Sequence, residues 1–307
     1  MIVSLAGGVG AAKFLEGLIR VVPQKELTVI GNVGDDMEIY GLHVSPDLDI
    51  VAYTLAGLVD KDKGWGIRND TFSFLTALRR YGYETWFNIG DRDLATHTFR
   101  TEQLRNGQNL SEITATIVNR LGLRINLLPA TNNAFQTYVT THGKQIHFQE
   151  YMVKLRTKPR VQRVSFHGAK SAKPAPCVIR SIRQARGIII CPSNPIVSIG
   201  AILNVPRIRN ALKNTASRIA AISPIVRGKT IKGPAAKLMK ALCVEPSAVG
   251  VAEIYRDFLD TLILDEQDKH LAKKVEDLGV KAVVTNTIMA TLQDKIRLAR
   301  TVMREFS

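Results

Sequence analysis

The chain opens with MIVSLAGGVGAAKFLEGLI, residues 1–19. An apolar strand is followed by the loop Gly7-Gly8-Val9-Gly10, and then by apolar residues at helical spacing over 14–19. A strand, a glycine loop and a helix in this order are typical of the first unit of an α/β fold. Ligands in such folds bind beyond the carboxyl ends of the strands.

Strands alternate with helices in the second half of the chain, and an earlier strand is expected over 27–30. We expect strands at 188–190, 218–222, 261–264 and 281–285. The helices are expected over 176–186, from about 199, and over 235–242, 270–278 and 293–306. This alternation predicts a three-layer, Rossmann-like α/β fold with a mostly parallel sheet covered on both faces.

Residues 60–123 show no strand pattern, but they contain three helix patterns that each end at a glycine. The expected helices are 70–81, 91–104 and 111–121. We predict one α/β domain over 1–307, with 60–123 inserted as a small helical subdomain.

The segments around this insertion carry further signals. Ser45 is expected to cap a helix that begins at Pro46. Residues 135–141 and 144–151 are expected to form a hairpin, and 161–166 a further strand.

Positive charge is concentrated in the middle of the chain. The whole sequence carries 42 Lys and Arg against 27 Asp and Glu, a net charge of +15. Residues 113–244 hold 22 of the basic residues and one acid, Glu150, whereas the rest of the chain has a net charge of −6. The partner of the middle segment is therefore expected to be an anion.

Composition excludes several classes of protein. With 45% hydrophobic and 22% charged residues, the chain is expected to be globular. No apolar run approaches the length of a membrane span, and the N-terminus lacks a signal pattern, so we expect a cytoplasmic protein with no membrane partner. Cys177, Cys191 and Cys243 have no metal-type spacing and are expected to be reduced and mostly buried.

The glycine loop is a candidate nucleotide site. Gly7, Gly8 and Gly10 directly follow a strand, so backbone N–H groups and a helix start can approach a phosphate. The loop has neither the third glycine of a dinucleotide fingerprint nor the Gly-Lys-Ser/Thr of a P-loop. A tight, closely packed turn is the alternative interpretation.

Four charged residues are candidates for metal binding or catalysis. Asp35 and Asp36 follow the second strand, where α/β folds place carboxylates for a metal ion or a ribose, although either could cap the next segment. Asp49 could instead only complement a helix dipole. Arg92, between two aspartates, could bind phosphate or pair with its neighbours.

Two later loops also fall at the carboxyl ends of expected strands. Pro192-Ser193-Asn194-Pro195 combines rigid prolines with two hydrogen-bonding side chains. The second loop runs from Ser223 to Gly233 and is expected to meet a diphosphate through its basic side chains, which are Arg227, Lys229 and Lys232. The six histidines form no His-x-x-x-His pair, so a zinc hydrolase or histidine triad is disfavoured.

Six motifs, in order and nearly from end to end, resemble the 2-phospho-L-lactate transferase family of coenzyme F-420 biosynthesis. They are Gly7-Gly8-Val9-Gly10, Ser45-Pro46-Asp47-Leu48-Asp49, the segment WGIRNDTF at 65–72, GDRDLATH at 90–97, PSNPIVSIG at 192–200 and GPAAKLM at 233–239. The resemblance implies a Mg²⁺-dependent transferase. Its donor is a guanosine diphosphate ester of 2-phospholactate, phosphoenolpyruvate or a related three-carbon acid, and its acceptor is the terminal ribityl hydroxyl of the deazaflavin Fo, with GMP released.

The resemblance also implies roles for individual residues. Asp49 and Asn88 match the residues that contact Fo. Asp35, Asp36 and Asp49 become the candidates for holding Mg²⁺ or for receiving the hydroxyl proton, and Arg92 or a loop lysine for stabilising the leaving GMP. The nucleotide would lie against the residues Gly7, Gly8, Gly10, Ser193, Asn194, Ser223, Arg227 and Gly233.

Two other functions remain open. A nucleic-acid-binding protein would explain the basic middle, but the sole aromatic residue in 152–244 is Phe166, so base stacking is disfavoured and we expect no nucleic-acid partner. A nonenzymatic binder of nucleotide sugars is the second alternative. The surplus charge would also suit the acidic flanks of a second copy, which predicts a homodimer.

Overall fold

Seven parallel strands form the central sheet of the computed structural model, which describes residues 1–231 and 233–306. In chain order they are β1 (Ile2–Ala6), β2 (Leu27–Gly31), β5 (Asn126–Pro129), β9 (Gly187–Ile190), β10 (Arg218–Ile222), β13 (Thr261–Asp265) and β14 (Lys281–Thr285). Their order across the sheet is β14-β13-β10-β9-β1-β2-β5. The four expected second-half strands and the strand at 27–30 are all present.

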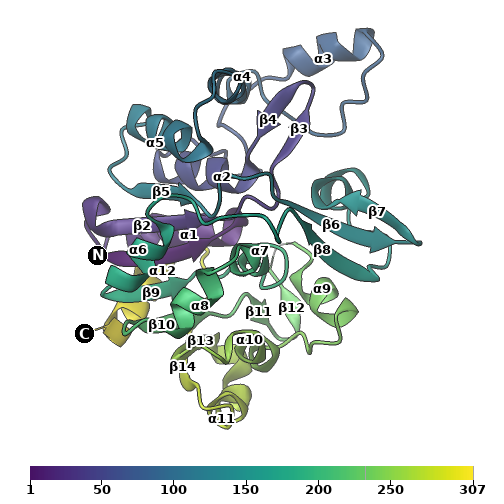
Figure 1. Cartoon of the computed structure of the whole chain (residues 1–307). Coiled ribbons are helices and arrows are strands. Elements are labelled where there is room, and N and C mark those ends of the chain that lie inside the picture. The colour runs from purple at the N-terminus through teal and green to yellow at the C-terminus, as the bar shows by residue number, and fades with distance from the viewer. Residues whose placement is uncertain (232, 307) are drawn as a thin grey trace.

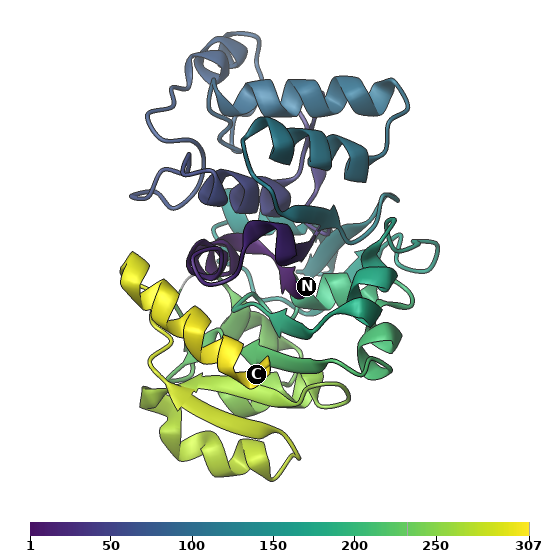
Figure 2. The same cartoon turned by 90° about the vertical axis from the view of Figure 1, so that its left-hand side faces the viewer.

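Helices cover both faces of the sheet, which explains why every residue of β1, β2 and β9 is buried and why these strands are apolar except at Ser4 and Thr28. Figures 1 and 2 show α1 and α12 on one face and α6, α7 and α8 on the other. The bounds of these five helices are α1 Gly8–Leu18, α6 Val178–Gln184, α7 Ile199–Asn204, α8 Ile208–Lys213 and α12 Leu292–Met303. Gly17 lets α1 approach α12, because a Cβ there would collide with the backbone of Lys295.

The strand order places a topological switch point between β1 and β9. The chain winds outward from β1 through β2 to β5, and then returns to the other side of β1 to build β9 and the strands beyond it. Loops that leave neighbouring strands at such a point diverge and open a crevice at their carboxyl ends. Here those segments are the glycine loop after β1, of which Gly8 to Gly10 form the first turn of α1, and the Pro192–Pro195 loop after β9. In this structure the two segments stay in contact with each other.

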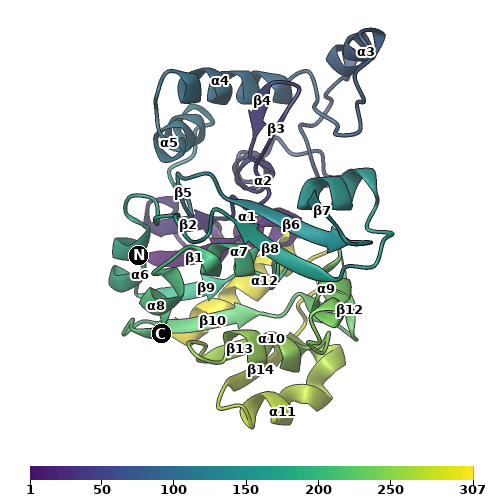
Figure 3. The same ribbon diagram turned by 45° about the vertical axis from the view of Figure 1, so that its right-hand side comes forward.

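A long excursion separates β2 from β5. It begins with the antiparallel hairpin β3 (Met37–Ile39) and β4 (Leu42–Val44), which the sequence analysis did not predict, and α2 (Pro46–Leu55). Three helices follow, α3 (Ser73–Arg80), α4 (Asp93–Arg105) and α5 (Leu110–Arg120). Figures 1 and 3 show α3 at the outer tip, far from the sheet.

A second, three-stranded sheet lies beyond the carboxyl ends of the central strands (Figure 3). It consists of β6 (Gln136–Thr141), β7 (Lys144–His147) and β8 (Arg163–His167), with β6 in the middle. The expected hairpin is confirmed, but the expectation that its second strand reaches 151 is wrong. That strand ends at His147, and Glu150–Lys154 forms a π-helical turn.

The remaining elements complete the second half of the chain. The short strands β11 (Ile225–Val226) and β12 (Lys229–Thr230) pair before α9 (Ala235–Ala241), and α10 (Ala248–Tyr255) precedes β13. The helix expected over 270–278 consists of a 3-10 turn, Glu266–Leu271, and α11, Ala272–Glu276. Two more 3-10 turns lie at Gln24–Glu26 and Arg304–Phe306.

Two expectations from composition meet the structure. All three cysteines are free, but only Cys191 is buried, so the expectation that they are mostly buried is wrong for Cys177 and Cys243. Both lie in exposed turns with positive φ. Among residues 1–231 and 233–306, no helix is long and apolar enough to cross a membrane.

Candidate active site

The two loops at the switch point contact each other directly. The Gly7 N–H donates to Ser193 Oγ at 3.1 Å, and Ser193 is buried. A Cβ on Gly10 would collide with the Pro192 carbonyl oxygen. The glycines are therefore required for close packing, and the N–H of Gly7 already has a partner within the protein.

A buried carboxylate, Asp47 in the first turn of α2, lies against the glycine loop. A Cβ on Gly7 would lie 2.6 Å from Asp47 Oδ2. Burial raises the pKa of Asp47 to about 7, although hydrogen bonds from Asn32 and from the Gly8 backbone act in the opposite direction. The glycine loop thus faces a carboxyl group whose pKa lies near neutral pH.

Asn32, at the end of β2, organises the carboxylates around it. Its Nδ2 donates to Asp35 Oδ1 at 3.1 Å and to Asp47 Oδ2 at 2.8 Å, while its Oδ1 accepts from the Gly34 N–H. Asp35 also accepts from Gln149 Nε2 at 2.6 Å. Burial and then the charge of Asp47 raise the pKa of Asp35 well above its ordinary value.

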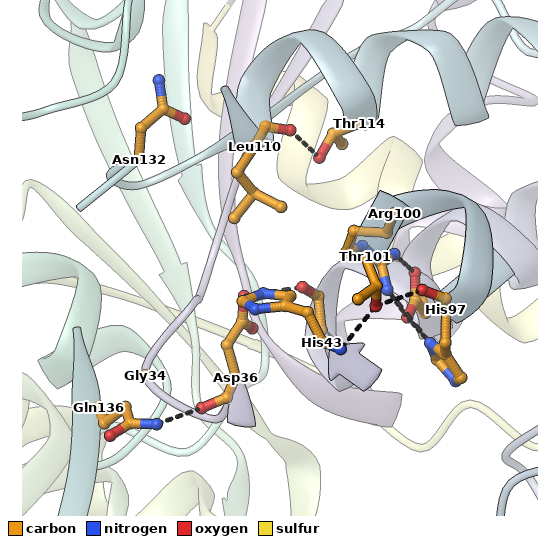
Figure 4. A network of polar contacts seen from close by, with 12 residues as sticks. Gly34, Asp36, His43, His97, Arg100, Thr101, Leu110, Thr114, Asn132 and Gln136 are labelled. Carbon is orange, nitrogen blue, oxygen red and sulfur yellow. Dashed lines mark hydrogen bonds and ion pairs between the residues drawn. The ribbon is translucent and has the colours of Figure 1, made fainter. Parts of the chain in front are cut away.

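Asp36 lies beside this cluster with one oxygen unsatisfied (Figure 4). Its Oδ2 accepts from Ser45 Oγ at 2.7 Å and lies 3.2 Å from His43 Nε2, but its buried Oδ1 has no hydrogen-bond partner among residues 1–231 and 233–306. Burial raises the pKa of Asp36, against the effect of His43 and Ser45. Ser45 is the N-cap residue of α2, as expected, but its hydroxyl donates to Asp36 and makes no capping hydrogen bond.

This chemistry suits a hard cation. An unpartnered carboxylate oxygen among buried carboxylates is stabilised when a divalent ion replaces the missing donor. Among residues 1–231 and 233–306, no three His, Cys, Asp or Glu side chains are placed to share one metal ion. That arrangement is compatible with Mg²⁺, which is commonly held by one or two carboxylates together with substrate phosphates.

Asp49 faces away from Asp47. Residues two positions apart on a helix point about 200° apart around its axis. The helix α2 therefore directs Asp47 to the glycine loop and Asp49 to α4. There Arg100 Nη1 donates to Asp49 Oδ2 at 3.0 Å, and Arg100 Nη2 donates to Asp49 Oδ1. Arg100 is only 1% exposed. Although burial alone would lower the pKa of Arg100, the charge and hydrogen bonds of Asp49 raise it.

The buried network on α4 continues beyond Arg100 (Figure 4). His97 Nδ1 lies 3.2 Å from Arg100 Nη1, and His97 Nε2 lies 3.2 Å from Asp93 Oδ1. Asp93 also accepts from the hydroxyl of Tyr53 on α2, at 2.8 Å. The GDRDLATH segment therefore anchors α4 to α2 through polar groups.

Asn88 and Arg92 lie outside these buried networks. Asn88 is exposed and lines a cavity of about 330 Å³ together with aromatic and cationic side chains, among them Trp65, Phe72 and Arg79. Arg92 is exposed at the start of α4, and its Nη1 donates to the Arg68 carbonyl at 3.4 Å. The acceptor and leaving-group candidates thus lie in the segment that joins α3 to α4.

Three of the candidate nucleotide residues shape their own loops. Asn194 Oδ1 accepts from the N–H groups of Ile196 and Val197, and the Ser223 hydroxyl donates to the Ile225 carbonyl and accepts from the Ile225 N–H. Gly233 has a φ of +87° just before α9.

The basic side chains of the second loop reach solvent. The backbone N–H of Arg227 donates to the Asp268 carboxylate. The side chains of Arg227 and Lys229 are both exposed. Lys232 lies outside the described residues.

A model of the family described as "2-phospho-L-lactate transferase CofD" matches residues 2–302 of this chain. The chain belongs to this family. Relatives of the CofD family member include a phosphoenolpyruvate transferase of Kitasatospora aureofaciens, 40% identical over 98% of this chain and 96% of that protein. A 2-phospho-L-lactate transferase of Methanosarcina mazei is 37% identical over 98% of this chain and 99% of that protein.

A solved structure shares the fold of this CofD family member. Protein BH3568 from Bacillus halodurans aligns with a TM-score of 0.65 at 17% identity, and the match covers 98% of each chain. The predicted Rossmann-like α/β class and the family resemblance are both confirmed.

Four residues that the sequence analysis did not single out as site residues are central to this region: Asn32, Asp47, His97 and Arg100. Asn32 follows a buried strand in the same loop as Asp35 and Asp36, so its position offered a signal. Asp47 lies in the first turn of α2, where the helix dipole alone favours an acid, so its position did not mark it as a site residue. Arg100 is 51 residues from its partner, and no local pattern marks it.

Proposed function

We propose that this CofD family transferase of coenzyme F-420 biosynthesis moves a phospho-three-carbon-acid group to the deazaflavin Fo. The donor is a guanosine diphosphate ester of lactate, enolpyruvate or a related acid, and GMP is released. The observation that carries the proposal is the buried Oδ1 of Asp36, which has no partner among the described residues and whose carboxylate interacts with Asp47, the carboxylate against the glycine loop. Diphosphate and a divalent ion are the groups that such a position accommodates.

Asp36 and Asp35 would hold Mg²⁺, with Asp49 as a further candidate. When bound, the ion would supply charge neutralisation to the diphosphate. The described contacts support this assignment differently for each carboxylate. Asp36 has an oxygen without a partner, whereas both oxygens of Asp49 accept from Arg100. Asp49 therefore fits better as a fixed negative group that orients the incoming hydroxyl.

The acceptor would occupy the cavity lined by Asn88. Trp65 and Phe72 offer apolar ring surface for a planar heterocycle, and the Asn88 amide offers a donor and an acceptor for its polar edge. The donor nucleotide would lie across the switch point against Gly7, Gly8, Gly10, Ser193 and Asn194 and under the Ser223–Gly233 loop.

The transfer balances without a further reactant. The ribityl oxygen forms a bond to the phosphorus that bears the acid, and the bond from that phosphorus to the bridging oxygen breaks. The hydroxyl proton passes to a carboxylate, Asp36 or Asp49. The charge that develops on GMP is stabilised by Arg92 or by the loop cations Arg227 and Lys229.

Product analysis tests the proposal directly. Purified protein is mixed with Fo, Mg²⁺ and each guanosine diphosphate ester in turn, and products are weighed by mass spectrometry. We expect one deazaflavin phosphodiester and one GMP per turnover with at least one donor. Asp36→Asn should lower turnover by about 10² or more, whereas Asp62→Asn, at an exposed aspartate between the same two strands, should not. Absence of a deazaflavin product with every donor would contradict the proposal.

A further inference from the structure

A cavity of about 550 Å³ lies outside the candidate active site. It is formed by the loop 168–177, the first turn of α6 and the turn between α7 and α8, on the face of the sheet opposite α1 and α12 (Figure 2). Its apolar lining includes Ala172, Pro174, Ile179 and Pro206. None of the residues assigned to the transfer reaction lines it.

Four cations surround this apolar lining: Lys170, Lys173, Arg180 and Arg207. No acidic residue lines the cavity. Within residues 1–231 and 233–306, none of the four pairs with a carboxylate, and Arg180 donates only to Gln184, at 3.1 Å. The cavity therefore gathers four of the 22 basic residues in 113–244, none of which the diphosphate site uses.

The walls of the cavity are fixed by backbone contacts. The N–H of Lys173 donates to Asn133 Oδ1 at 2.8 Å, and its carbonyl accepts from Thr131 Oγ1 at 2.6 Å. The N–H of Ala175 donates to the Ala130 carbonyl at 3.0 Å. The loop 168–177 is thereby tied to the segment after β5. Cys177 and Arg207 hold left-handed conformations, with φ of 69° and 73°, which residues with a Cβ adopt only when their surroundings impose it.

The lining argues against a nucleotide or a free phosphate. No aromatic ring lines the cavity to stack on a base. The N–H groups of Ser171 and Ala172 donate to the Gly168 carbonyl, so they are not available to cradle a phosphate. Long cationic side chains around an apolar surface instead match carboxylates that flank an aliphatic side chain.

We propose that this cavity docks an acidic segment of another protein, with one aliphatic side chain on the apolar lining and carboxylates against Lys170, Lys173, Arg180 and Arg207. The positive charge of the surrounding residues also favours an acidic partner. Of the 22 basic residues in 113–244, only Lys154, Arg209 and Lys213 pair with carboxylates among the described residues. An excess of this size accelerates the approach of acidic partners.

The test uses a fluorescein-labelled octapeptide of Asp and Glu with one central Leu, titrated with the full chain and followed by anisotropy at physiological salt. The cavity variant is Lys170→Glu/Lys173→Glu/Arg180→Glu. The control is Arg120→Glu/Lys144→Glu/Lys240→Glu, three exposed residues of the same basic segment that carry the same change in charge. We expect the cavity variant to weaken binding at least about tenfold and the control about twofold or less.

Other outcomes would overturn the proposal. Equal weakening in both variants would mean attraction by net charge alone. Displacement of the peptide by equimolar inorganic phosphate or GMP would mean a small-anion site. A change in the oligomeric state of the cavity variant, measured by ultracentrifugation without peptide, would mean that a second copy of this chain covers the cavity. Transferase activity and the unfolding temperature of each variant report whether it is folded.

Discussion

Asp70 and Asp91 cap each other's helices. The Asp91 carboxylate accepts from the N–H groups of Ser73 and Phe74 at the start of α3, and the Asp70 carboxylate accepts from those of Arg92 and Asp93 at the start of α4. Each had been expected to begin its own helix, and the exchange explains why the helices start three and two residues later. These hydrogen bonds hold the segments that precede α3 and α4 together. They pack closely at Gly90, where a Cβ would collide with Asp70.

Removing these capping hydrogen bonds should disorder the walls of the cavity that we propose for the acceptor. Asp91→Ala removes the cap of α3, whose residues Leu75, Thr76 and Arg79 line the cavity beside Asn88. We expect a lower unfolding temperature and a higher KM for Fo, with kcat changed little. Thr98→Ala, at an exposed position on α4, is the control. An unchanged KM for Fo would show that the cavity does not hold the acceptor.

The sequence predicted most of the central sheet, because the strands are short and mainly apolar, as in 188–190, and this pattern can be recognised without tertiary information. It missed β5, where Asn126 and Pro129 leave only two apolar residues and where pairing with β2 supplies the strand. It also missed the hairpin β3–β4, whose turn places Tyr40 and Gly41 at positive φ. Tyr-Gly is not among the strong turn pairs.

The candidate site was predicted less completely than the fold. Motif position identified the loops that meet at the switch point, since the carboxyl ends of parallel strands share one edge. The difference between Asp47 and Asp49 depends on how α2 is rotated against the sheet, which its sequence does not specify. The Asp49–Arg100 pair joins two helices across the inserted segment, and only the tertiary structure brings them together.

Arg100 should be essential for stability only while Asp49 is charged. Arg100→Met leaves a buried carboxylate without its partner, and we expect a loss of about 3–5 kcal/mol in the free energy of unfolding. The double variant Arg100→Met/Asp49→Leu removes both charges and should recover most of that loss while remaining inactive. Urea denaturation measures the stabilities. A double variant no more stable than Arg100→Met would refute this account of the pair.

Asp36→Asn should separate function from stability. Asp36 is buried with one oxygen unpartnered, so removal of its charge should leave the free energy of unfolding unchanged or raised. Turnover should fall by about 10² or more, the range that general-base catalysis supplies. Fo binding, followed by the fluorescence of the deazaflavin, should be retained. Full turnover in Asp36→Asn would remove this residue from the mechanism.

Asp47 should make the metal-free protein less stable as pH rises. Burial raises the pKa of Asp47 in the folded state to about 7, so between pH 4 and 7 the folded protein binds more protons than the unfolded chain. Stability from this group is present at low pH and is lost as pH approaches 7, by a few kcal/mol at most. Asp47→Asn should flatten this part of the profile of unfolding temperature against pH. An identical profile in the variant would contradict the assignment.

Gly10→Ala should disrupt the contact between the glycine loop and the Pro192–Pro195 loop while leaving most of the fold intact. Gly10 packs directly against the Pro192 carbonyl, and this backbone group cannot rotate away from an added side chain. A methyl group must push the Pro192–Pro195 loop outward, and that shift separates Ser193 Oγ from the Gly7 N–H. We expect a large rise in KM for the guanosine diphosphate donor and a smaller rise for Fo, because Asn88 lies on a different segment. Lys13→Ala, an exposed residue on the same helix, should change neither constant. A Gly10→Ala enzyme with an unchanged donor KM would show that the nucleotide does not bind between these loops.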